Sequence, residues 1–425
     1  MSKNSYTDCL KAMFGLRRFG IKLGLDTIQN ILSELGNPQN RFHSVHIAGT
    51  NGKGSVASTL ASILQTAGFT VGLYTSPHLV RFNERIRINN RNISESLTVE
   101  LYKAVKSVHQ GEREPTFFEF TTAMAFYAFG DADVDWAIIE TGMGGRLDAT
   151  NIIQPALSII TNISLEHQTY LGDTLDDIAR EKGGIIKAGI PVISGVKQNV
   201  AQSVIKGLAD AKAAPLFQMG KDFRVERNPH QSQTFTYHGM DNVWHDMRTA
   251  LHGRFQIDNA ALALAACEIL NRDHESLLPA HIKKGMEQTQ WPGRLEMIPG
   301  KPMVILDGAH NLAAAHTLAD YLQTEIKPRK ITLVTGILDD KPYSEMLKAL
   351  LDVCDSVILT QPEINRSLPP ETLAEIARKM ITDVSVIPEV GQAIQYAVKM
   401  TNPADVVCIA GSLYLVGDAK KALEL

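Results

Sequence analysis

The sequence predicts an α/β protein of two domains: an N-terminal P-loop-type domain with a mostly parallel sheet, and a smaller C-terminal Rossmann-like domain. The first observation is length, because a single hydrophobic core stops growing at roughly 250–300 residues and this chain has 425. The second is a strand, glycine loop, helix and strand between residues 42 and 75. The third is a regular alternation of strands and helices in the last third of the chain.

The composition is that of a folded protein, with 44% hydrophobic and 21% charged residues. A net charge of −4 gives no basic field that would favour nucleic acid or an anionic membrane. The four cysteines lie far apart without a CxxC pair, which favours a reducing compartment. With no apolar signal core and no run long enough to span a bilayer, we expect a soluble, cytoplasmic monomer with neither nucleic-acid nor membrane partners.

The first elements form a βαβ unit. Residues 5–36 have helical character, and residues 42–48 read as a short buried strand followed by a glycine-rich loop. Apolar residues then recur at helical spacing from Val56 to Ala67, and Gly68 supplies a stop signal. A second strand follows at 70–75, so a parallel sheet with a right-handed crossover is expected.

Two further apolar runs, 134–139 and 156–160, are short enough for buried parallel strands. Polar residues follow each run, with Glu140 after the first and Asn162 after the second. Ligands in open α/β sheets bind beyond the carboxyl ends of the strands, where these residues would lie. The polar and aromatic stretch 215–250 is interpreted as a small antiparallel insertion.

The domain boundary is predicted in the stretch 291–302, where two Pro–Gly pairs and a further proline break both helix and strand. We therefore predict an ATP-binding domain over 1–294 and a C-terminal domain over 299–425. Five parallel strands are expected in the second domain, at 304–306, 331–335, 356–360, 384–387 and 406–409. The absence of GxGxxG argues against a dinucleotide.

The glycine-rich loop is a candidate phosphate site formed by Gly49, Thr50, Asn51, Gly52, Lys53, Gly54 and Ser55. Successive backbone N–H groups and a helix N-terminus favour an anion. Lys53 would contact the β- and γ-phosphates, and Ser55 would cap the helix and ligate magnesium. The spacing departs from the usual P-loop, because Gly54 follows Lys53 and Ile47 stands where a glycine is usual. A purely structural tight turn is the alternative.

Together with five other motifs, the loop resembles the folate branch of the Mur ligase superfamily, the folylpolyglutamate synthases. Residues 75–86 are similar to that branch's mobile loop, and residues 140–151 to its most specific signature. The motifs at 181–185, 292–294 and 307–311 follow in the family's order. The resemblance implies ATP-dependent ligation, in which a folate or dihydropteroate carboxylate becomes an acyl phosphate and the amine of L-glutamate displaces phosphate.

The resemblance also implies a magnesium site with Ser76, Glu140 and His167 around one metal. Glu140 suits magnesium because this ion prefers oxygen ligands. Taken alone, His167 would more often be a surface or capping residue.

Lys182 has two interpretations. From its position it would be an exposed helix residue pairing with Asp176 or Asp177. The resemblance instead implies a carbamylated lysine that ligates metal in a two-magnesium site. Glu166 is interpreted as a carboxylate at a helix start or one that supports the metal ligands.

Near the predicted domain boundary, Arg294 can bridge phosphates and Asp307 can bind ribose hydroxyls or orient phosphate ligands. An interdomain salt bridge is their alternative. Asn259 either begins a helix or, by resemblance, contacts adenine. His310 is either a helix N-terminal residue or a contact for the reacting groups. We expect the two domains to close on ATP.

For the pterin substrate, the resemblance points to Lys22, Leu23, Gly24, Arg81, Thr116, Phe117, Phe118 and Arg146. An aromatic ring can stack on the heterocycle, although Phe117 and Phe118 are equally natural core residues. The run 116–120 is close to that of bifunctional bacterial members, which often carry Tyr where Phe117 stands, and it favours dihydropteroate use. Asp148 is expected to hold the pterin substrate or the glycine-rich signature loop. The alternative is an ion pair with Arg146 that stabilises the turn.

Two other functions were weighed. A ligase acting on a UDP-sugar peptide would need a domain ahead of the phosphate loop, and the residues before Gly49 are too few. A non-catalytic ATP-binding switch would not require the joint occurrence of Glu140, His167, Lys182, Arg294 and Asp307.

Overall fold

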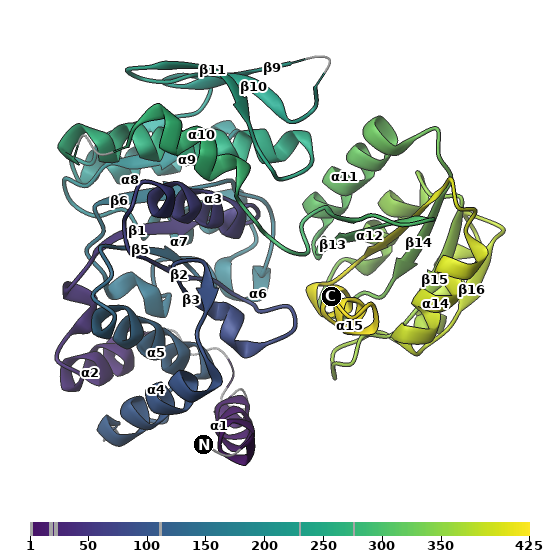
Figure 1. Cartoon of the computed structure of the whole chain (residues 1–425), viewed down its shortest axis with the longest axis horizontal. Coiled ribbons are helices and arrows are strands. Elements are labelled where there is room, and N and C mark those ends of the chain that lie inside the picture. Colours follow the sequence, from purple (N-terminus) through teal and green to yellow (C-terminus); the bar gives the residue numbers. More distant parts are fainter. Residues whose placement is uncertain (1–2, 17–19, 21–23, 110–112, 229–230, 275–276) are drawn as a thin grey trace. The chain divides into compact units, whose positions relative to one another are not determined.

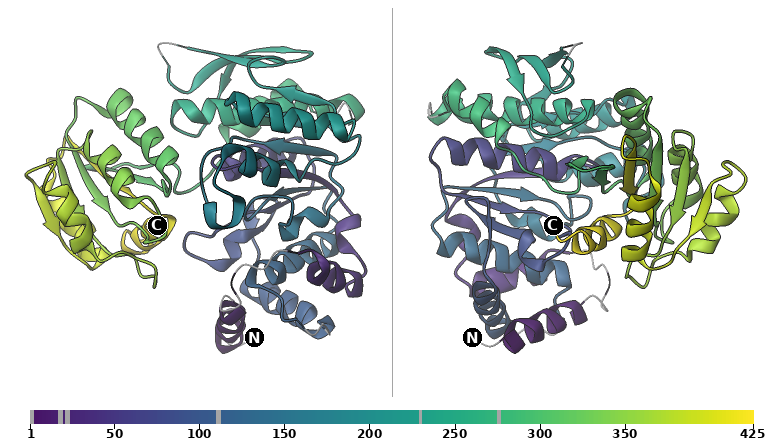
Figure 2. Two further views of the ribbon diagram at one scale, coloured as in Figure 1. Left: turned by 180° about the vertical axis from the view of Figure 1, so that it is seen from behind. Right: turned by 45° about the vertical axis from the view of Figure 1, so that its right-hand side comes forward.

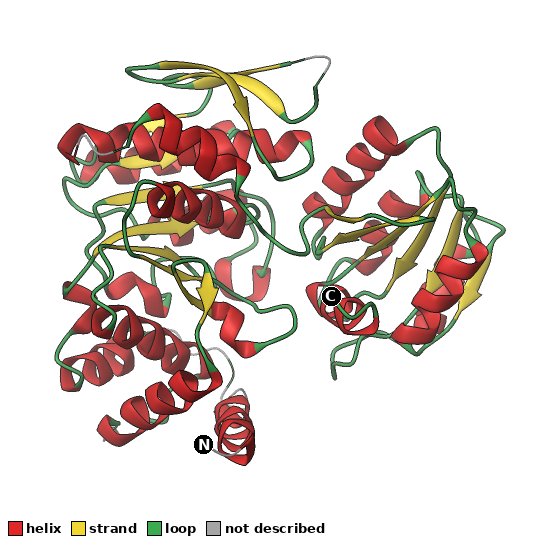
Figure 3. Ribbon diagram, in the orientation of Figure 1, coloured by secondary structure: helices red, strands yellow, loops and turns green. Residues whose placement is uncertain are grey.

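The computed structural model describes residues 3–16, 20, 24–109, 113–228, 231–274 and 277–425. It divides into two compact units, the first formed by Met1–Ala250 and Gln256–Gln290, the second by Leu251–Phe255 and Trp291–Leu425. In both units helices flank a mostly parallel sheet (Figures 1 and 3), which confirms the predicted fold class.

The first unit contains an eight-stranded sheet in the order β4-β3-β2-β5-β1-β6-β7-β8. Its strands are β1 (His43–Ala48), β2 (Val71–Tyr74), β3 (Ile86–Ile88), β4 (Arg91–Asn92), β5 (Trp136–Glu140), β6 (Leu157–Ile160), β7 (Val192–Ser194) and β8 (Leu216–Gln218). Strands β2, β5, β1, β6, β7 and β8 run parallel, whereas β3 and β4 form an antiparallel edge. The central strands are almost entirely buried, which explains why β5 and β6 are mostly apolar.

Helices cover both faces of this sheet (Figure 2). They are α1 (Lys3–Gly15), α2 (Asp26–Glu34), α3 (Lys53–Thr66), α4 (Glu95–Val108), α5 (Phe117–Asp131), α6 (Gln168–Leu171), α7 (Leu175–Gly183), α8 (Asn199–Ala211), α9 (Arg254–His274, which begins in the second unit) and α10 (Pro279–Glu287). One core joins α3, α9 and α10 to the sheet, and another joins α4 and α5 to the opposite face. Helices α3 and α10 approach closely, since a Cβ on Gly285 would lie 2.5 Å from the Cα of Ile63.

The stretch 215–250 is only partly the insertion that the sequence predicts. Strands β9 (Arg224–Arg227), β10 (Thr234–His238) and β11 (Val243–Arg248) form the expected antiparallel sheet. Strand β8 instead pairs in parallel with β7 and extends the main sheet, so the predicted insertion begins too early. The reason is that β8 follows α8 and completes another right-handed βαβ crossover.

The second unit contains a six-stranded sheet in the order β12-β13-β17-β14-β15-β16. Its strands are β12 (Glu296–Ile298), β13 (Met303–Asp307), β14 (Ile331–Thr335), β15 (Ser356–Leu359), β16 (Val384–Val386) and β17 (Val406–Ala410), and its helices are α11 (Leu312–Tyr321), α12 (Tyr343–Leu351), α13 (Pro370–Ala377), α14 (Val390–Met400) and α15 (Leu413–Ala422). Five strands are parallel as predicted. Strand β12 is antiparallel to β13 and lies in the stretch that the sequence assigned to a linker. Across the described ranges, no helix is both long and apolar enough to cross a bilayer.

Candidate nucleotide and metal site

The glycine-rich loop joins β1 to α3 and is fixed to the end of β6. The backbone N–H of Thr50 donates to the Asn162 carbonyl at 2.9 Å, and that of Asn51 donates to Asn162 Oδ1 at 2.9 Å. Thr161 Oγ1 donates to the Asn51 carbonyl at 2.6 Å. A Cβ on Gly49 would lie 1.9 Å from Thr161 Oγ1, so only glycine fits there. The end of β6 therefore fixes the position of the loop.

Lys53 is the first residue of α3, and its ammonium lies over the loop. Its Nζ donates to the carbonyls of Gly49 at 2.9 Å and Thr50 at 3.2 Å. Gly52, not Ser55, is the residue before the helix, and it makes no side-chain cap. The expectation that Ser55 caps the helix is therefore wrong, because Ser55 is buried within the first turn.

Asn259 of α9 lies against the same loop. Gly52 has a φ of 83°, and a Cβ on it would lie 2.4 Å from Asn259 Oδ1. The Asn259 amide also donates to Gln256 Oε1 at 2.8 Å. The structure thus brings the predicted adenine contact to the phosphate loop.

Lys182 is 1% exposed, so its interpretation as an exposed helix residue is wrong. Its Nζ donates to Glu166 Oε1 at 2.6 Å and to the Gly49 carbonyl at 3.0 Å. Burial lowers the pKa of Lys182 to about 8, against the opposing charge of Glu166. Burial raises the pKa of Glu166, but the ammonium groups of Lys182 and Lys53 bring it down to about 2. Two lysine ammonium groups therefore converge on one loop carbonyl, with Glu166 beside them.

The two acidic residues that the sequence suggests as partners of Lys182 have other partners. Asp176 pairs with Arg180 at 2.7 Å, and Asp177 accepts the Thr174 hydroxyl at 2.6 Å. Both contacts lie on the outer surface of α7.

Glu140 ends β5 and is buried, and its Oε2 accepts the backbone N–H of Ser76 at 3.0 Å. The structure therefore brings together two of the predicted metal ligands. His167 directly precedes α6 with a φ of 46°, an uncommon conformation for a residue with a side chain. Within the described part of the chain, no three His, Cys, Asp or Glu residues are grouped as a metal cluster. A single carboxylate with serine hydroxyls still fits magnesium, which keeps several waters or phosphate oxygens as ligands.

Asp148 organises the signature loop rather than pairing with Arg146. Its Oδ2 accepts the Met143 N–H at 2.9 Å, and its Oδ1 accepts the Thr150 hydroxyl at 2.6 Å. Burial raises the pKa of this carboxyl, and the hydrogen bonds oppose that rise. Arg146 instead pairs with Glu181 at 2.8 Å. The proposed Asp148–Arg146 pair is therefore wrong, because α7 supplies the partner of the arginine.

The two candidate aromatic residues of the folate site face different neighbours. Phe118 lies against the signature loop, since a Cβ on Gly142 would be 2.5 Å from its ring. Phe117 belongs to a cluster in which the Arg85 guanidinium lies 5.1 Å from its ring centroid and the Phe14 ring lies 5.7 Å away. Thr116 caps α5 by accepting the Glu119 N–H at 3.2 Å. Gly24 is described, whereas Lys22 and Leu23 lie outside the described residues.

Sequence reasoning missed Glu84, which fixes the mobile loop. Its carboxylate accepts the backbone N–H groups of Leu79 at 2.7 Å, Val80 at 3.0 Å and Arg81 at 2.7 Å. The signal that would have identified it is the three-residue spacing from Arg81, typical of a carboxylate that reaches back over a turn.

In the second unit, Arg294, Asp307 and His310 gather around Gly308. Asp307 accepts the backbone N–H groups of Leu295 and Ala309, both at 2.9 Å. Burial raises the pKa of Asp307, and the Arg294 charge opposes this. A Cβ on Gly308 would lie 2.1 Å from Arg294 Nη1, and His310 Nδ1 lies 2.8 Å from the Gly308 carbonyl.

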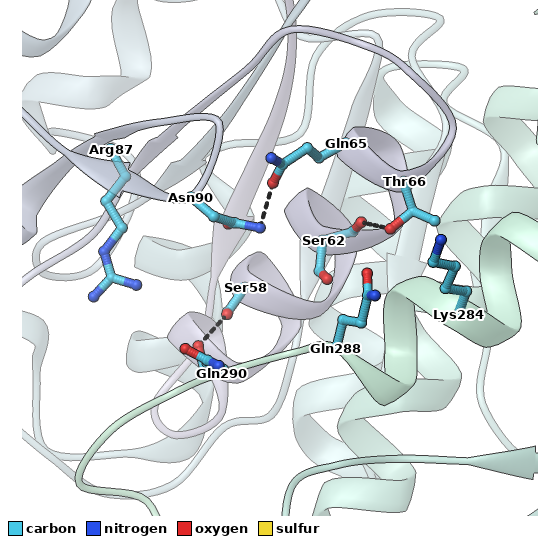
Figure 4. Close-up of a pocket in the computed structure, with 9 residues that line it drawn as sticks. All are labelled: Ser58, Ser62, Gln65, Thr66, Arg87, Asn90, Lys284, Gln288 and Gln290. Carbon is cyan, nitrogen blue, oxygen red and sulfur yellow. Dashed lines mark hydrogen bonds between the residues drawn. The ribbon is translucent and has the colours of Figure 1, made fainter.

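A separate polar cavity of about 400 Å³ lies beside α3 and α10 (Figure 4). It is lined by Ser58, Ser62, Gln65, Thr66, Arg87, Asn90, Lys284, Gln288 and Gln290. None of the predicted site residues is among those that line it.

Comparison with known proteins gives consistent matches over the whole chain. The Mur ligase middle domain matches residues 47–267, and the Mur ligase glutamate ligase domain matches residues 293–413. The dihydrofolate synthase/folylpolyglutamate synthase of Bacillus subtilis is 36% identical over 99% of both chains. The solved structure of Escherichia coli FolC with DHPP and ADP has a TM-score of 0.90 at 30% identity, covering 98% of this chain and 97% of that one. A bifunctional folylpolyglutamate synthase/dihydrofolate synthase with Mn, AMPPNP and L-glutamate bound has a TM-score of 0.87 at 29% identity, covering 98% of both chains.

Proposed function

The chain belongs to the Mur ligase family, and from that premise we propose that it adds L-glutamate to tetrahydrofolate and to dihydropteroate through an acyl phosphate. It is an ATP-dependent ligase that forms carbon–nitrogen bonds, of the dihydrofolate synthase/folylpolyglutamate synthase type. The observation that carries the mechanism is the convergence of Lys53 and Lys182 on the Gly49 carbonyl, at the N-terminus of α3.

A carboxylate is a poor electrophile, so its oxygen must first become a leaving group. In the proposed first step an acceptor carboxylate oxygen attacks the γ-phosphorus and ADP leaves. In the second step the glutamate amine attacks the acyl carbon, the carbon–oxygen bond breaks, and phosphate and a proton are released. The N–H groups of residues 52–55 and the dipole of α3 hold the phosphates in place, while those of Thr50 and Asn51 tie the loop to Asn162. Lys53 exchanges its loop carbonyls for phosphate oxygens and neutralises the charge that develops.

Ser55, Ser76, Glu140 and His167 are the residues that we propose to hold magnesium, in a two-metal site. Bound magnesium supplies charge neutralisation at the phosphates. The backbone N–H of Ser76, at 3.0 Å, fixes Oε2 of the Glu140 carboxylate beside Ser76. The related enzyme solved with Mn, AMPPNP and L-glutamate supports divalent metal and nucleotide use.

Lys182 is proposed to carry a carbamate when CO₂ is present. Only the neutral amine reacts with CO₂, and a pKa of about 8 leaves part of the Lys182 population neutral at physiological pH. Glu166 would have to leave Nζ, because two anions would repel. Carbon NMR of the native protein with labelled CO₂ tests this. We expect a carbamate signal in the parent and none in Lys182→Arg, and a parent protein without this signal would contradict the proposal.

The remaining assignments concern the substrates. Asn259, Arg294 and Asp307 are proposed to contact ATP, and His310 to approach the reacting groups. Gly24, Arg81, Thr116, Phe117, Phe118, Arg146 and the signature loop held by Asp148 are proposed for the folate. Support is strongest for Phe118, because its ring covers the signature loop beside the strand that ends in Glu140.

The decisive experiment is phosphate release with ATP, magnesium and L-glutamate, comparing dihydropteroate with tetrahydrofolate. We expect release with both acceptors and none without acceptor. Labelling the acceptor carboxylate with heavy oxygen should transfer one label to the released phosphate. Activity on a UDP-sugar peptide precursor but on neither folate would overturn the assignment, and unlabelled phosphate would exclude the acyl phosphate.

A further inference from the structure

His46 is an ionisable residue in the middle of the first sheet that the proposed chemistry does not use. It lies on β1, in register with Ile139 of β5 on one side and Ser158 of β6 on the other, and it is inaccessible to solvent. Its Nε2 lies 2.8 Å from Thr150 Oγ1. Thr150, in the 3₁₀ turn Ala149–Ile152, donates its hydroxyl to Asp148 Oδ1 at 2.6 Å. A chain of hydrogen bonds therefore runs from the sheet to the signature loop.

The direction of this chain follows from counting protons. Thr150 has one hydroxyl proton, and it lies on the short bond to the Asp148 carboxylate. The hydroxyl oxygen must then accept a hydrogen bond from His46 Nε2–H, which fixes the neutral Nε2–H tautomer. In the reverse direction, Asp148 would be protonated and His46 would carry its proton on Nδ1. Nδ1 has no hydrogen-bond partner among the described residues, so the reverse direction would bury a donor without an acceptor.

The surroundings keep His46 neutral. Burial lowers the pKa of His46 to about 3, and the Lys187 charge acts in the same direction. Asp148 also accepts the backbone N–H groups of Met143 at 2.9 Å and Thr150 at 3.1 Å. Its carboxylate therefore stabilises the conformation of the signature loop.

We propose that His46 is a positioning residue: by donating to Thr150 it sets the orientation of the Asp148 carboxylate, and through it the shape of the signature loop that binds the acceptor. The last clause rests on the proposed function, whereas the hydrogen-bond chain does not. Because β1 also leads into the phosphate loop, one strand supports both the nucleotide loop and, through His46, the acceptor loop.

Two matched pairs of variants test the proposal. His46→Gln retains an N–H donor near the position of Nε2, whereas His46→Leu removes it at similar size. Thr150→Ser retains the hydroxyl, whereas Thr150→Val removes it. We expect Thr150→Val, which removes a hydrogen bond to the Asp148 carboxylate, to raise the acceptor KM on the order of tenfold. His46→Leu removes a hydrogen bond between neutral groups and should raise it roughly threefold to tenfold. His46→Gln and Thr150→Ser should stay close to the parent, and the Kd for an ATP analogue should be unchanged in all four.

A merely structural role would lower thermal stability and the active fraction without selectively raising the acceptor KM. Equal acceptor KM values within each pair would overturn the proposal, and if His46→Leu does not fold, the Thr150 pair decides. Nitrogen NMR of the parent protein gives a readout independent of activity. We expect the neutral Nε2–H tautomer from about pH 5 to about pH 8, and an Nδ1–H or protonated ring would refute the chain. A parent enzyme inactive on both folates would refute the proposed function alone.

Discussion

Lys182 Nζ lies 2.6 Å from Glu166 Oε1, and the two side chains are 1% and 9% exposed. The pair lies beside the phosphate loop, because Lys182 also donates to the Gly49 carbonyl. A buried ion pair adds little over an apolar pair, but removing one partner leaves an uncompensated charge and is strongly destabilising. The pair therefore links the stability of the first unit to the protonation of Glu166.

Glu166→Gln should lower the free energy of unfolding by about 3 kcal/mol at neutral pH. The pKa of Glu166 is depressed from 4.5 to about 2 in the folded chain, so its stabilising contribution is complete above about pH 4.5. That contribution is lost as the pH falls toward 2, and the difference between parent and variant should shrink over this window. Urea unfolding in a chelating buffer, followed by circular dichroism, measures it. Asp176→Asn, which breaks an exposed pair, is the control and should cost less than about 1 kcal/mol. A difference independent of pH would contradict the prediction.

Gly52→Ala should weaken ATP-analogue binding by at least about tenfold, because the added Cβ is strained at positive φ. Gly52 has a φ of 83°, and the new methyl would lie 2.4 Å from Asn259 Oδ1, which would displace the loop. Calorimetric titration measures the affinity. Gly207→Ala is the matched control, since a Cβ there meets nothing within 4 Å on α8. Unchanged binding in Gly52→Ala would remove the loop from the nucleotide site.

Glu140→Gln should reduce turnover at least about a hundredfold, because the loss of the anionic ligand removes charge stabilisation worth several kcal/mol. The glutamine oxygen can still accept the Ser76 N–H, so the fold should persist. Turnover and manganese affinity, the latter from electron paramagnetic resonance, are measured together. Glu226→Gln changes an exposed carboxylate and should alter neither. Full activity in Glu140→Gln would exclude this residue from the metal site.

The sequence predicts correctly those elements whose burial produces an apolar pattern within the element's own residues. Strand β5 is buried on both faces, and all its residues before Glu140 are apolar, so the strand can be read directly from the sequence. Strands β8 and β12 are three-residue edge strands with partly exposed side chains, and no periodicity can develop over that length. Their pairing is decided by the neighbouring strand and not by their own residues.

Within the site, the sequence identifies residues but not their partners. Lys182 is predicted to be important, yet its partner Glu166 lies 16 residues away and meets it only through the packing of α7. Arg146 stands two residues from Asp148, which suggested a pair, but Glu181 takes the arginine. His46 is buried within β1, and its hydrogen bond to Thr150 joins residues 104 positions apart in the sequence. Long-range contacts of this kind leave no spacing signal in a single sequence.

The insertion sheet depends on Glu268, whose buried carboxylate on α9 accepts the Tyr237 hydroxyl at 2.8 Å and the backbone N–H groups of Met240 and Asn242 at 2.9 Å. Glu268→Ala leaves the buried Tyr237 hydroxyl without an acceptor and removes the acceptor of the loop N–H groups, so it should lower the free energy of unfolding by about 2 kcal/mol. Tyr237→Phe removes only one donor and should cost about 1 kcal/mol. Because the insertion holds none of the proposed catalytic residues, kcat of the folded fraction should be unchanged in both variants. Urea unfolding and steady-state turnover provide the two measurements. If the two substitutions cost equally little, the carboxylate does not anchor the sheet. If kcat falls instead, the insertion contributes to the reaction itself.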